Sequence, residues 1–231
     1  MRLLDHLQSS LPKYRTTIPS TGKETFFRPF LVKEEKILLM AKDNDDDSTV
    51  LNAIANIVES CVDGVKSAYK IPMVDLEYLF CQIRAKSVSE TAEPIFTCPV
   101  TDESVRVGIN LTDLDIYKSD VEDVVKINDE MTIKMKSPTV YDYMNIDNKN
   151  ATDSLISRCI NTITLNEEVF DGSDISEDEK TEFIENLTHA QYDKLCNFIT
   201  EQPYVYKVVE YRTKDGVERK LRLEGMLDFF G

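Results

Sequence analysis

The chain has 231 residues, of which 42% are hydrophobic, so it can bury a sizeable core without disulfides or metal ions. Its five cysteines stand singly, which excludes a local C-x-x-C pair of metal ligands and is typical of small core residues in a reducing compartment. The formal net charge of -15 argues against a nucleic-acid partner, because phosphate binding draws on clustered lysines and arginines.

Secretion and membrane insertion are not expected either. No run of eighteen apolar residues is present, and Asp5 interrupts the apolar stretch that a signal peptide would need. We therefore expect a soluble cytosolic protein that does not contact a membrane.

Residues 1–24 are predicted to form an extended N-terminal arm, because Pro12, Pro19 and Gly22 interrupt a stretch without clear periodicity. Residues 25–90 are predicted to be mainly helical, with an extended start, a helix from about Lys33, and a second amphipathic helix from about Val50 to Gly64.

The acidic stretch between those two helices, K-D-N-D-D-D at 42–47, has the alternate carboxylates of a calcium loop. An EF-hand would need Gly at the sixth position and Glu at the twelfth, and Ser48 and Ile54 stand there instead. We interpret the stretch as a capping loop before the next helix.

The most densely patterned segment is the helix predicted from Met73 to Lys86, which is apolar around most of its circumference. Such a helix is normally buried on several sides, so Glu77, Gln82 and Arg84 must find partners or share the remaining exposed face. Arg84 and Lys86 either end a central core helix or bind a partner.

Residues 91–136 alternate between apolar and polar, which predicts a hairpin of 94–98 with 105–111 and two further strands at 124–127 and 131–135. Residues 137–203 are predicted to be helical. Helices are expected from Pro138 to Met144, over 151–164, and after the capping boxes that begin at Ser176 and Thr188.

Residues 204–231 close the chain with a β-hairpin, turned at Asp215-Gly216, and a tail. Aligning Thr101 with Thr213 also aligns alternating apolar positions of the two hairpins, so they are either a weak internal repeat or a chance similarity. The predicted class is α+β, with helical segments before and after the middle hairpins, in one or two compact domains.

Catalysis receives little support from the sequence. His6 and His189 are the only imidazoles, and no nucleophile elbow, zinc-protease motif or phosphate-binding glycine loop is present. We therefore expect a protein that is not an enzyme and needs no cofactor. A carboxylate-based enzyme is the remaining catalytic hypothesis, and a pocket with converging carboxylates would be its first sign.

Three segments, taken in order, carry a resemblance to a known family: F-F-R-P-F-L-V-K-E-E-K-I-L-L-M-A at 26–41, D-L-E-Y-L-F-C-Q-I-R-A-K-S-V-S-E at 75–90, and L-E-G-M-L-D-F-F-G at the C-terminus. The chain resembles the small baseplate hub proteins of T-even-type contractile-tailed bacteriophages over nearly its full length. The resemblance implies a structural subunit or assembly factor that binds other hub proteins, in the host cytoplasm during assembly or in the virion tail.

The resemblance also implies C-x-x-C zinc knuckles at the hairpin turns, and here the sequence departs from the pattern. The first turn keeps Cys98 but has Thr101 in the second position, and the turn from Arg212 to Gly216 has no cysteine. Structural zinc requires four ligands, so we predict that no metal is bound and that the Asp-Gly turn and apolar faces hold the hairpins instead.

Candidate contacts with other hub proteins are an arginine of the arm, the Phe26–Phe30 segment, the end of the 73–86 helix, and the apolar C-terminus, where residues either fold onto the core or meet a partner. They are Arg15, Phe26, Phe27, Phe30, Arg84, Lys86, Met226, Leu227, Phe229 and Phe230. An oligomer within the baseplate is left open. The alternative is an accessory domain with degenerate zinc-ribbon-like hairpins that binds nucleic acid or another protein. A basic strip of Arg106, Arg219, Lys220 and Arg222 would favour it.

Overall fold

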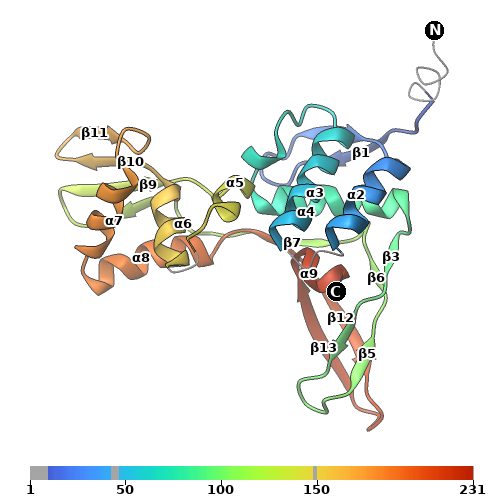
Figure 1. The fold of residues 1–231 in the computed structure, drawn as a ribbon. Coiled ribbons are helices and arrows are strands. Elements are labelled where there is room, and N and C mark those ends of the chain that lie inside the picture. The colour runs from blue at the N-terminus through green and yellow to red at the C-terminus, as the bar shows by residue number, and fades with distance from the viewer. Residues whose placement is uncertain (1–9, 43–46, 148–149, 231) are drawn as a thin grey trace. The chain divides into compact units, whose positions relative to one another are not determined.

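The computed structural model describes residues 10–42, 47–147 and 150–230, and the chain divides into two compact units (Figure 1). Unit 1 consists of residues 1–117 and 204–231, and unit 2 of residues 118–203. Both combine helices with antiparallel sheets, which confirms the predicted α+β class. The boundary lies inside the region predicted as one β segment, 91–136, so its strands belong to both units. The capping loop expected at 42–47 lies largely outside the described residues.

Unit 1 is built around helix α4 (Met73–Ser87), in agreement with the segment singled out in the sequence. Leu76, Leu79, Phe80, Cys81 and Ile83 of α4 are all buried. Helix α3 (Asp47–Cys61) packs against α4, and α2 (Val32–Lys42) packs against α3. A short 3-10 turn, η1 (Ala68–Lys70), leads into α4.

The N-terminal arm is a β-hairpin over much of its length, which the sequence analysis did not predict. Strand β1 (Tyr14–Thr17) pairs antiparallel with β2 (Glu24–Phe27), and Gly22 adopts φ +66° in the connecting turn. The turn is held to α4, because Asp75 accepts hydrogen bonds from the backbone N–H and the hydroxyl of Ser20. The described part of the arm, from residue 10 onward, is therefore held by contacts within its own unit.

The middle hairpin of unit 1 is divided into two short ladders. Strand β4 (Ile95–Thr97) pairs with β5 (Ser104–Arg106), whereas β3 (Thr91–Ala92) pairs with β6 (Ile109–Asn110). The predicted continuous strand 105–111 is thus wrong in detail, because pairing is interrupted at Val107 and Gly108, although the two chain segments do lie side by side.

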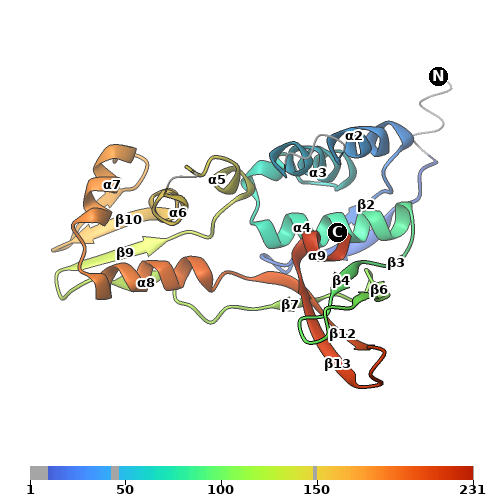
Figure 2. The same cartoon turned by 60° about the horizontal axis from the view of Figure 1, so that its bottom comes forward.

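A three-stranded sheet completes unit 1. Strand β12 (Tyr204–Arg212) lies between β7 (Asp115–Tyr117) and β13 (Glu218–Glu224), and the predicted turn holds Gly216 at φ +77°. The last described residues form a short helix, α9 (Gly225–Phe230), which contacts α4, β12 and β13 (Figure 2). The chain thus ends by folding back onto its central helix.

Unit 2 contains a four-stranded antiparallel sheet in the order β11-β10-β9-β8. Strands β8 (Val124–Lys126) and β9 (Met131–Met135) agree with the prediction, whereas β10 (Ile160–Leu165) and β11 (Glu168–Asp171) were missed. The expected all-helical region and the 151–164 helix are therefore wrong: α6 (Ala151–Cys159) ends at Cys159, and the β-branched residues after it enter the sheet.

Three further helices flank this sheet and begin at recognisable caps. Helix α5 (Val140–Met144) begins after Thr139 and not after Ser137, because Thr139 and Asp142 form a capping box. Helices α7 (Glu177–Glu185) and α8 (His189–Thr200) begin after the predicted caps Ser176 and Thr188. The core between helices and sheet is apolar and includes Ile133, Ile156, Cys159, Leu195 and Phe198. Within the described ranges, no helix has the length and hydropathy needed to cross a bilayer.

Unit 2 should fold on its own, because its sheet and core come entirely from residues 118–203. Tyr117 and Tyr204, which flank it in the chain, are paired neighbours in unit 1, so its two ends are close together. We expect the isolated fragment 118–203 to unfold cooperatively on heating, as followed by circular dichroism. Ile156→Ala should lower its free energy of unfolding by about 3 kcal/mol, and a fragment without a cooperative transition would contradict this division.

Candidate functional site

The predicted contact residues of the arm segment divide into exposed and buried ones. Arg15 is exposed and forms an ion pair with Glu24, and Phe26 is 48% exposed on β2. Phe27 points the other way: it is 2% exposed and its ring contacts that of Tyr14. Phe30 is partly buried, and its backbone N–H donates to the Ser87 hydroxyl. Arg15 and Phe26 are therefore the members of this group that a partner can reach.

The C-terminal candidates are divided in the same way. Met226 and Phe229 are buried against the rest of unit 1, whereas Leu227 is 76% exposed. Lys86 lies over the Tyr14 ring at 5.4 Å and pairs with Glu90. Most of the apolar C-terminus thus docks on its own domain, which leaves Leu227 as its exposed apolar side chain within the described residues.

Arg84 lies beneath the C-terminal helix. Its guanidinium stacks on the Phe230 ring at 4.6 Å, and that ring also meets Phe80 edge-on at 5.8 Å. One guanidinium nitrogen of Arg84, Nη1, is buried without a hydrogen-bond partner among the described residues, and burial lowers the pKa of the side chain. Arg84 is therefore a partly desolvated cation that holds the C-terminus through its ring contact.

A surface that the sequence analysis did not single out lies on α2. Four of its apolar side chains, Val32, Ile37, Leu39 and Met40, are between 51% and 68% exposed. The helix is apolar on more sides than it can bury, because only one side packs on α3. The sequence does contain a continuous apolar run, I-L-L-M-A at 37–41, that could have indicated this surface. Periodicity alone does not show which side of such a helix meets the core. We call these four residues the α2 apolar face.

Glu77 connects α4 to the C-terminal helix. Its carboxylate accepts from the Met226 backbone N–H at 3.4 Å, and a Cβ on Gly225, which has φ +66°, would lie 2.8 Å from Glu77 Oε1. Burial raises the pKa of Glu77 to about 7, although the backbone N–H groups of Met226 and Val205 favour the ionised form. Glu77 therefore changes charge close to neutral pH at the point where α9 begins.

In unit 1, the turn between β4 and β5 meets the turn between β12 and β13, and these two turns are called the hairpin tips. The Lys214 backbone N–H donates to Glu103 at 3.1 Å, and Phe96 packs edge-on against Tyr211. Cys98 is fully buried there, with its Sγ 3.3 Å from the Tyr211 hydroxyl. The Thr101 hydroxyl, buried without another partner in the part of the chain described, and the Tyr211 hydroxyl lower the pKa of the Cys98 thiol to about 7.

An arginine at the start of β13 binds the second turn. Arg219 is largely buried and donates to Thr213 Oγ1 and to both carboxylate oxygens of Asp215. The side chains at the two tips that could act as metal ligands are thus one thiol, hydroxyls and a carboxylate already bound to arginine. This set does not fit structural zinc. No group of three or more His, Cys, Asp or Glu side chains in the described segments could hold a metal ion. The guanidinium supplies the positive charge that joins these polar groups.

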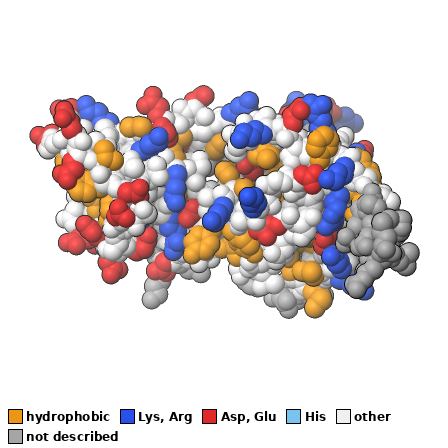
Figure 3. Space-filling view, turned by 90° about the horizontal axis from the view of Figure 1, so that it is seen from above, with side chains coloured by type: hydrophobic (Ala, Val, Ile, Leu, Met, Phe, Trp, Pro, Cys, Tyr) orange, Lys and Arg blue, Asp and Glu red, His pale blue; other side chains and the backbone are white. Residues whose placement is uncertain are grey.

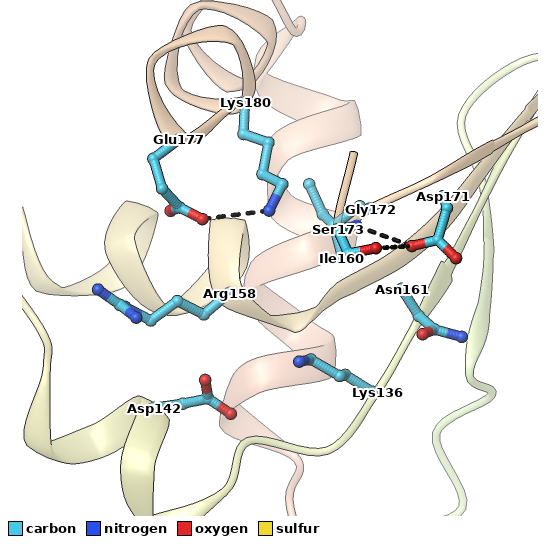
Figure 4. A pocket seen from close by; sticks show the side chains of 10 residues that line it. All are labelled: Lys136, Asp142, Arg158, Ile160, Asn161, Asp171, Gly172, Ser173, Glu177 and Lys180. Atoms are coloured by element: carbon cyan, nitrogen blue, oxygen red, sulfur yellow. Dashed lines mark hydrogen bonds and ion pairs between the residues drawn. The ribbon is translucent and has the colours of Figure 1, made fainter. Parts of the chain in front are cut away.

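Unit 2 carries a small polar pocket of about 220 Å³, shown in Figure 4. It is lined by Lys136, Asp142, Arg158, Ile160, Asn161, Asp171, Gly172, Ser173, Glu177 and Lys180. Carboxylates do converge here, as the catalytic hypothesis required. However, Asp142 accepts from Thr139 in a helix cap, and Asp171 accepts from Ser173, which lowers its pKa. Both carboxylates are therefore acceptors in local backbone structure, Asp142 in a helix cap and Asp171 in the turn after β11.

The charge of Glu77 should make stability depend on pH. Its folded-state pKa lies above the ordinary value of 4.5, so its contribution is fully present below about pH 4.5 and is lost as pH rises through 7. We expect the free energy of unfolding of Glu77→Gln, relative to that of wild type, to rise by on the order of 2 kcal/mol from pH 5 to pH 8. Urea denaturation at both pH values measures this change. The same pH dependence of the free energy of unfolding in Glu77→Gln and in wild type would refute the assignment.

Tyr211 should control the acidity of the thiol at the hairpin tips. Tyr211→Phe removes one of the two hydroxyls that favour the thiolate, so the pKa of Cys98 should rise from about 7 toward its ordinary value near 9. NMR titration of the cysteine ¹³Cβ signals measures the change. Tyr206→Phe, on the other face of β12, is the matched control and should leave the titration at its wild-type midpoint.

Comparison with known proteins supports the broader part of the resemblance, which is to baseplate proteins of T4-type phages. The family model described as T4 bacteriophage base plate protein matches residues 11–231, which is nearly the whole chain. No significant match is found among curated proteins or among solved structures. Because the match spans both units, it covers the fold as a whole and not one hairpin or helix. The chain belongs to the family of T4 bacteriophage base plate proteins.

Proposed function

We propose that the protein is a hub subunit or hub-assembly factor of the phage baseplate, which acts by binding other hub proteins and catalyses no reaction. The family match over residues 11–231 carries this proposal, since it implies a role in baseplate structure or assembly and fits a location in the virion tail. The hub-specific similarity in the segments at 26–41, 75–90 and the C-terminus supports the finer assignment.

The α2 apolar face supports a function based on contact. Its four side chains are individually more than half exposed on neighbouring turns of one helix, and the polar side chains between them include Lys33 and Lys36. Apolar groups clustered on one helix at the surface favour association, because water is released from them when a partner covers them. Phe26 and Leu227 are further exposed apolar side chains of unit 1.

The alternative of a nucleic-acid-binding accessory domain is less well supported. Each member of the proposed basic strip has an acidic partner: Arg106 with Glu93, Arg219 with Asp215, Lys220 with Glu210, and Arg222 with Glu224. These carboxylates neutralise the strip and leave little positive potential for phosphates. Arg222 also stacks on the Tyr206 ring at 3.8 Å, which fixes it to the sheet.

The proposal predicts capture of hub proteins through the α2 apolar face. The tagged chain, co-expressed with the other hub proteins of its phage, should form a stoichiometric complex by affinity capture and light scattering. Met40→Glu should weaken this complex by tenfold or more, since burying an unpaired carboxylate in an apolar contact costs more than about 1.4 kcal/mol. Val169→Glu is the matched control, because Val169 is similarly exposed, at 62%, but belongs to unit 2.

Mass spectrometry of purified virions then separates the two forms of the proposal. A complex that persists in the virion makes the protein a structural subunit, and capture without retention makes it an assembly factor. If no hub protein is captured by the wild-type chain, the hub assignment is wrong while the family assignment stands.

A further inference from the structure

Three cationic side chains from three different elements surround the pocket of unit 2. Lys136 follows β9, Arg158 lies on α6, and Lys180 lies on α7. This gathering runs against the composition of the unit, which has nineteen acidic and only eight basic residues. Acidic side chains accordingly dominate the surface over unit 2, at the left in Figure 3. A site that collects three of eight cations in so acidic a unit is a candidate for binding an anion.

Two of the three cations form no ion pair within the described residues, although the charge of Arg158 is felt by Glu177. Lys180 donates to Glu177 at 3.2 Å, whereas neither Lys136 nor Arg158 forms an ion pair with any described residue. Arg158 Nε is moreover buried without a hydrogen-bond partner in the described chain. Buried N–H groups of arginine are nearly always paired, so this donor indicates a missing acceptor.

The carboxylates that line the pocket already have donors. Asp142 accepts from the Thr139 N–H at 2.9 Å and from its hydroxyl at 2.7 Å, which holds the start of α5. Glu177 accepts from the Ser157 hydroxyl at 2.8 Å as well as from Lys180. They therefore do not satisfy Arg158, but their charges still repel a ligand. A singly charged, planar carboxylate fits this balance better than a doubly charged phosphate.

The wall of the pocket is rigid backbone. A Cβ on Gly172 would lie 2.3 Å from the Ile160 carbonyl oxygen and 2.9 Å from that of Asn161, so only glycine fits there. The Gly172 N–H also donates to the Asn161 carbonyl at 2.7 Å, which fixes the end of β11 against the start of β10. Figure 4 shows Lys136, Asp142, Glu177 and Lys180 around an open centre, with Arg158 along one side.

We propose that this pocket binds a single carboxylate group, held by Arg158 and Lys136 beside the fixed backbone at Gly172. The guanidinium and the lysine ammonium would each supply a charge-assisted contact to the carboxylate. The carboxylate belongs either to an acidic side chain of a bound protein or to a small molecule. The inference rests on unit 2 alone and does not depend on the hub assignment.

Titration of the full chain with sodium acetate, followed by ¹⁵N NMR at constant ionic strength, tests the site. Saturable shifts should be confined to amides around Gly172, Ser173 and Arg158. Arg158→Gln and Lys136→Met should each weaken binding about tenfold, the usual effect of removing a charge-assisted hydrogen bond. Lys134→Met is the matched control, because Lys134 lies on β9 two residues before Lys136, is about half exposed and pairs with Asp123.

Two parallel titrations identify the source and the class of the ligand. A short peptide with one internal glutamate that binds more tightly than acetate indicates a protein partner, and equal or weaker binding indicates a small carboxylate; both results support the site. Tighter binding of inorganic phosphate than of either carboxylate would overturn the proposed class. Shifts that do not saturate, or equal affinity in wild type, Arg158→Gln and Lys134→Met, would overturn the site, provided that thermal unfolding shows the variants to be folded.

Discussion

The structure of unit 1 depends on one constraint, which is that α4 is apolar on nearly every side and must be covered on nearly every side. Its polar side chains face inward with the apolar ones, so each needs a partner from another segment. Asp75 bonds to the turn between β1 and β2, Glu77 to the start of α9, and Gln82 to the backbone carbonyl of Leu111. Segments distant in sequence are thus held to α4 by hydrogen bonds. These bonds must form, because a buried polar group without a partner is costly.

This dependence explains which parts of unit 1 could be predicted from sequence. The pattern of α4 showed a central helix and showed that Glu77, Gln82 and Arg84 required partners, but no local rule could identify those partners. The same limit applies to the contact residues. Phe26 and Phe27 are chemically alike neighbours, and only the pairing of β2 decides that one is exposed and the other is core.

Unit 2 shows a different limit. The apolar spacing before Cys159 is helical, and Ile160 and Ile163 continue it, so periodicity favoured one long helix where a helix and a strand meet without a loop. The turn between β10 and β11 was not predicted, because Asn166 and Glu167 adopt the positive φ angles for which glycine would be the usual sequence signal. The polar pocket was equally hidden, since its cations come from three elements that only the correct sheet brings together.

The hairpin tips are joined by an arginine and polar contacts, where the resemblance in the sequence implied C-x-x-C knuckles. Arg219 provides a positive charge at the second turn from within the chain. It binds the acceptors of its own turn, while Cys98 and Tyr211 join the two hairpins. Every one of these contacts depends on the packing of unit 1, so the tips are held only as firmly as the sheet beneath them.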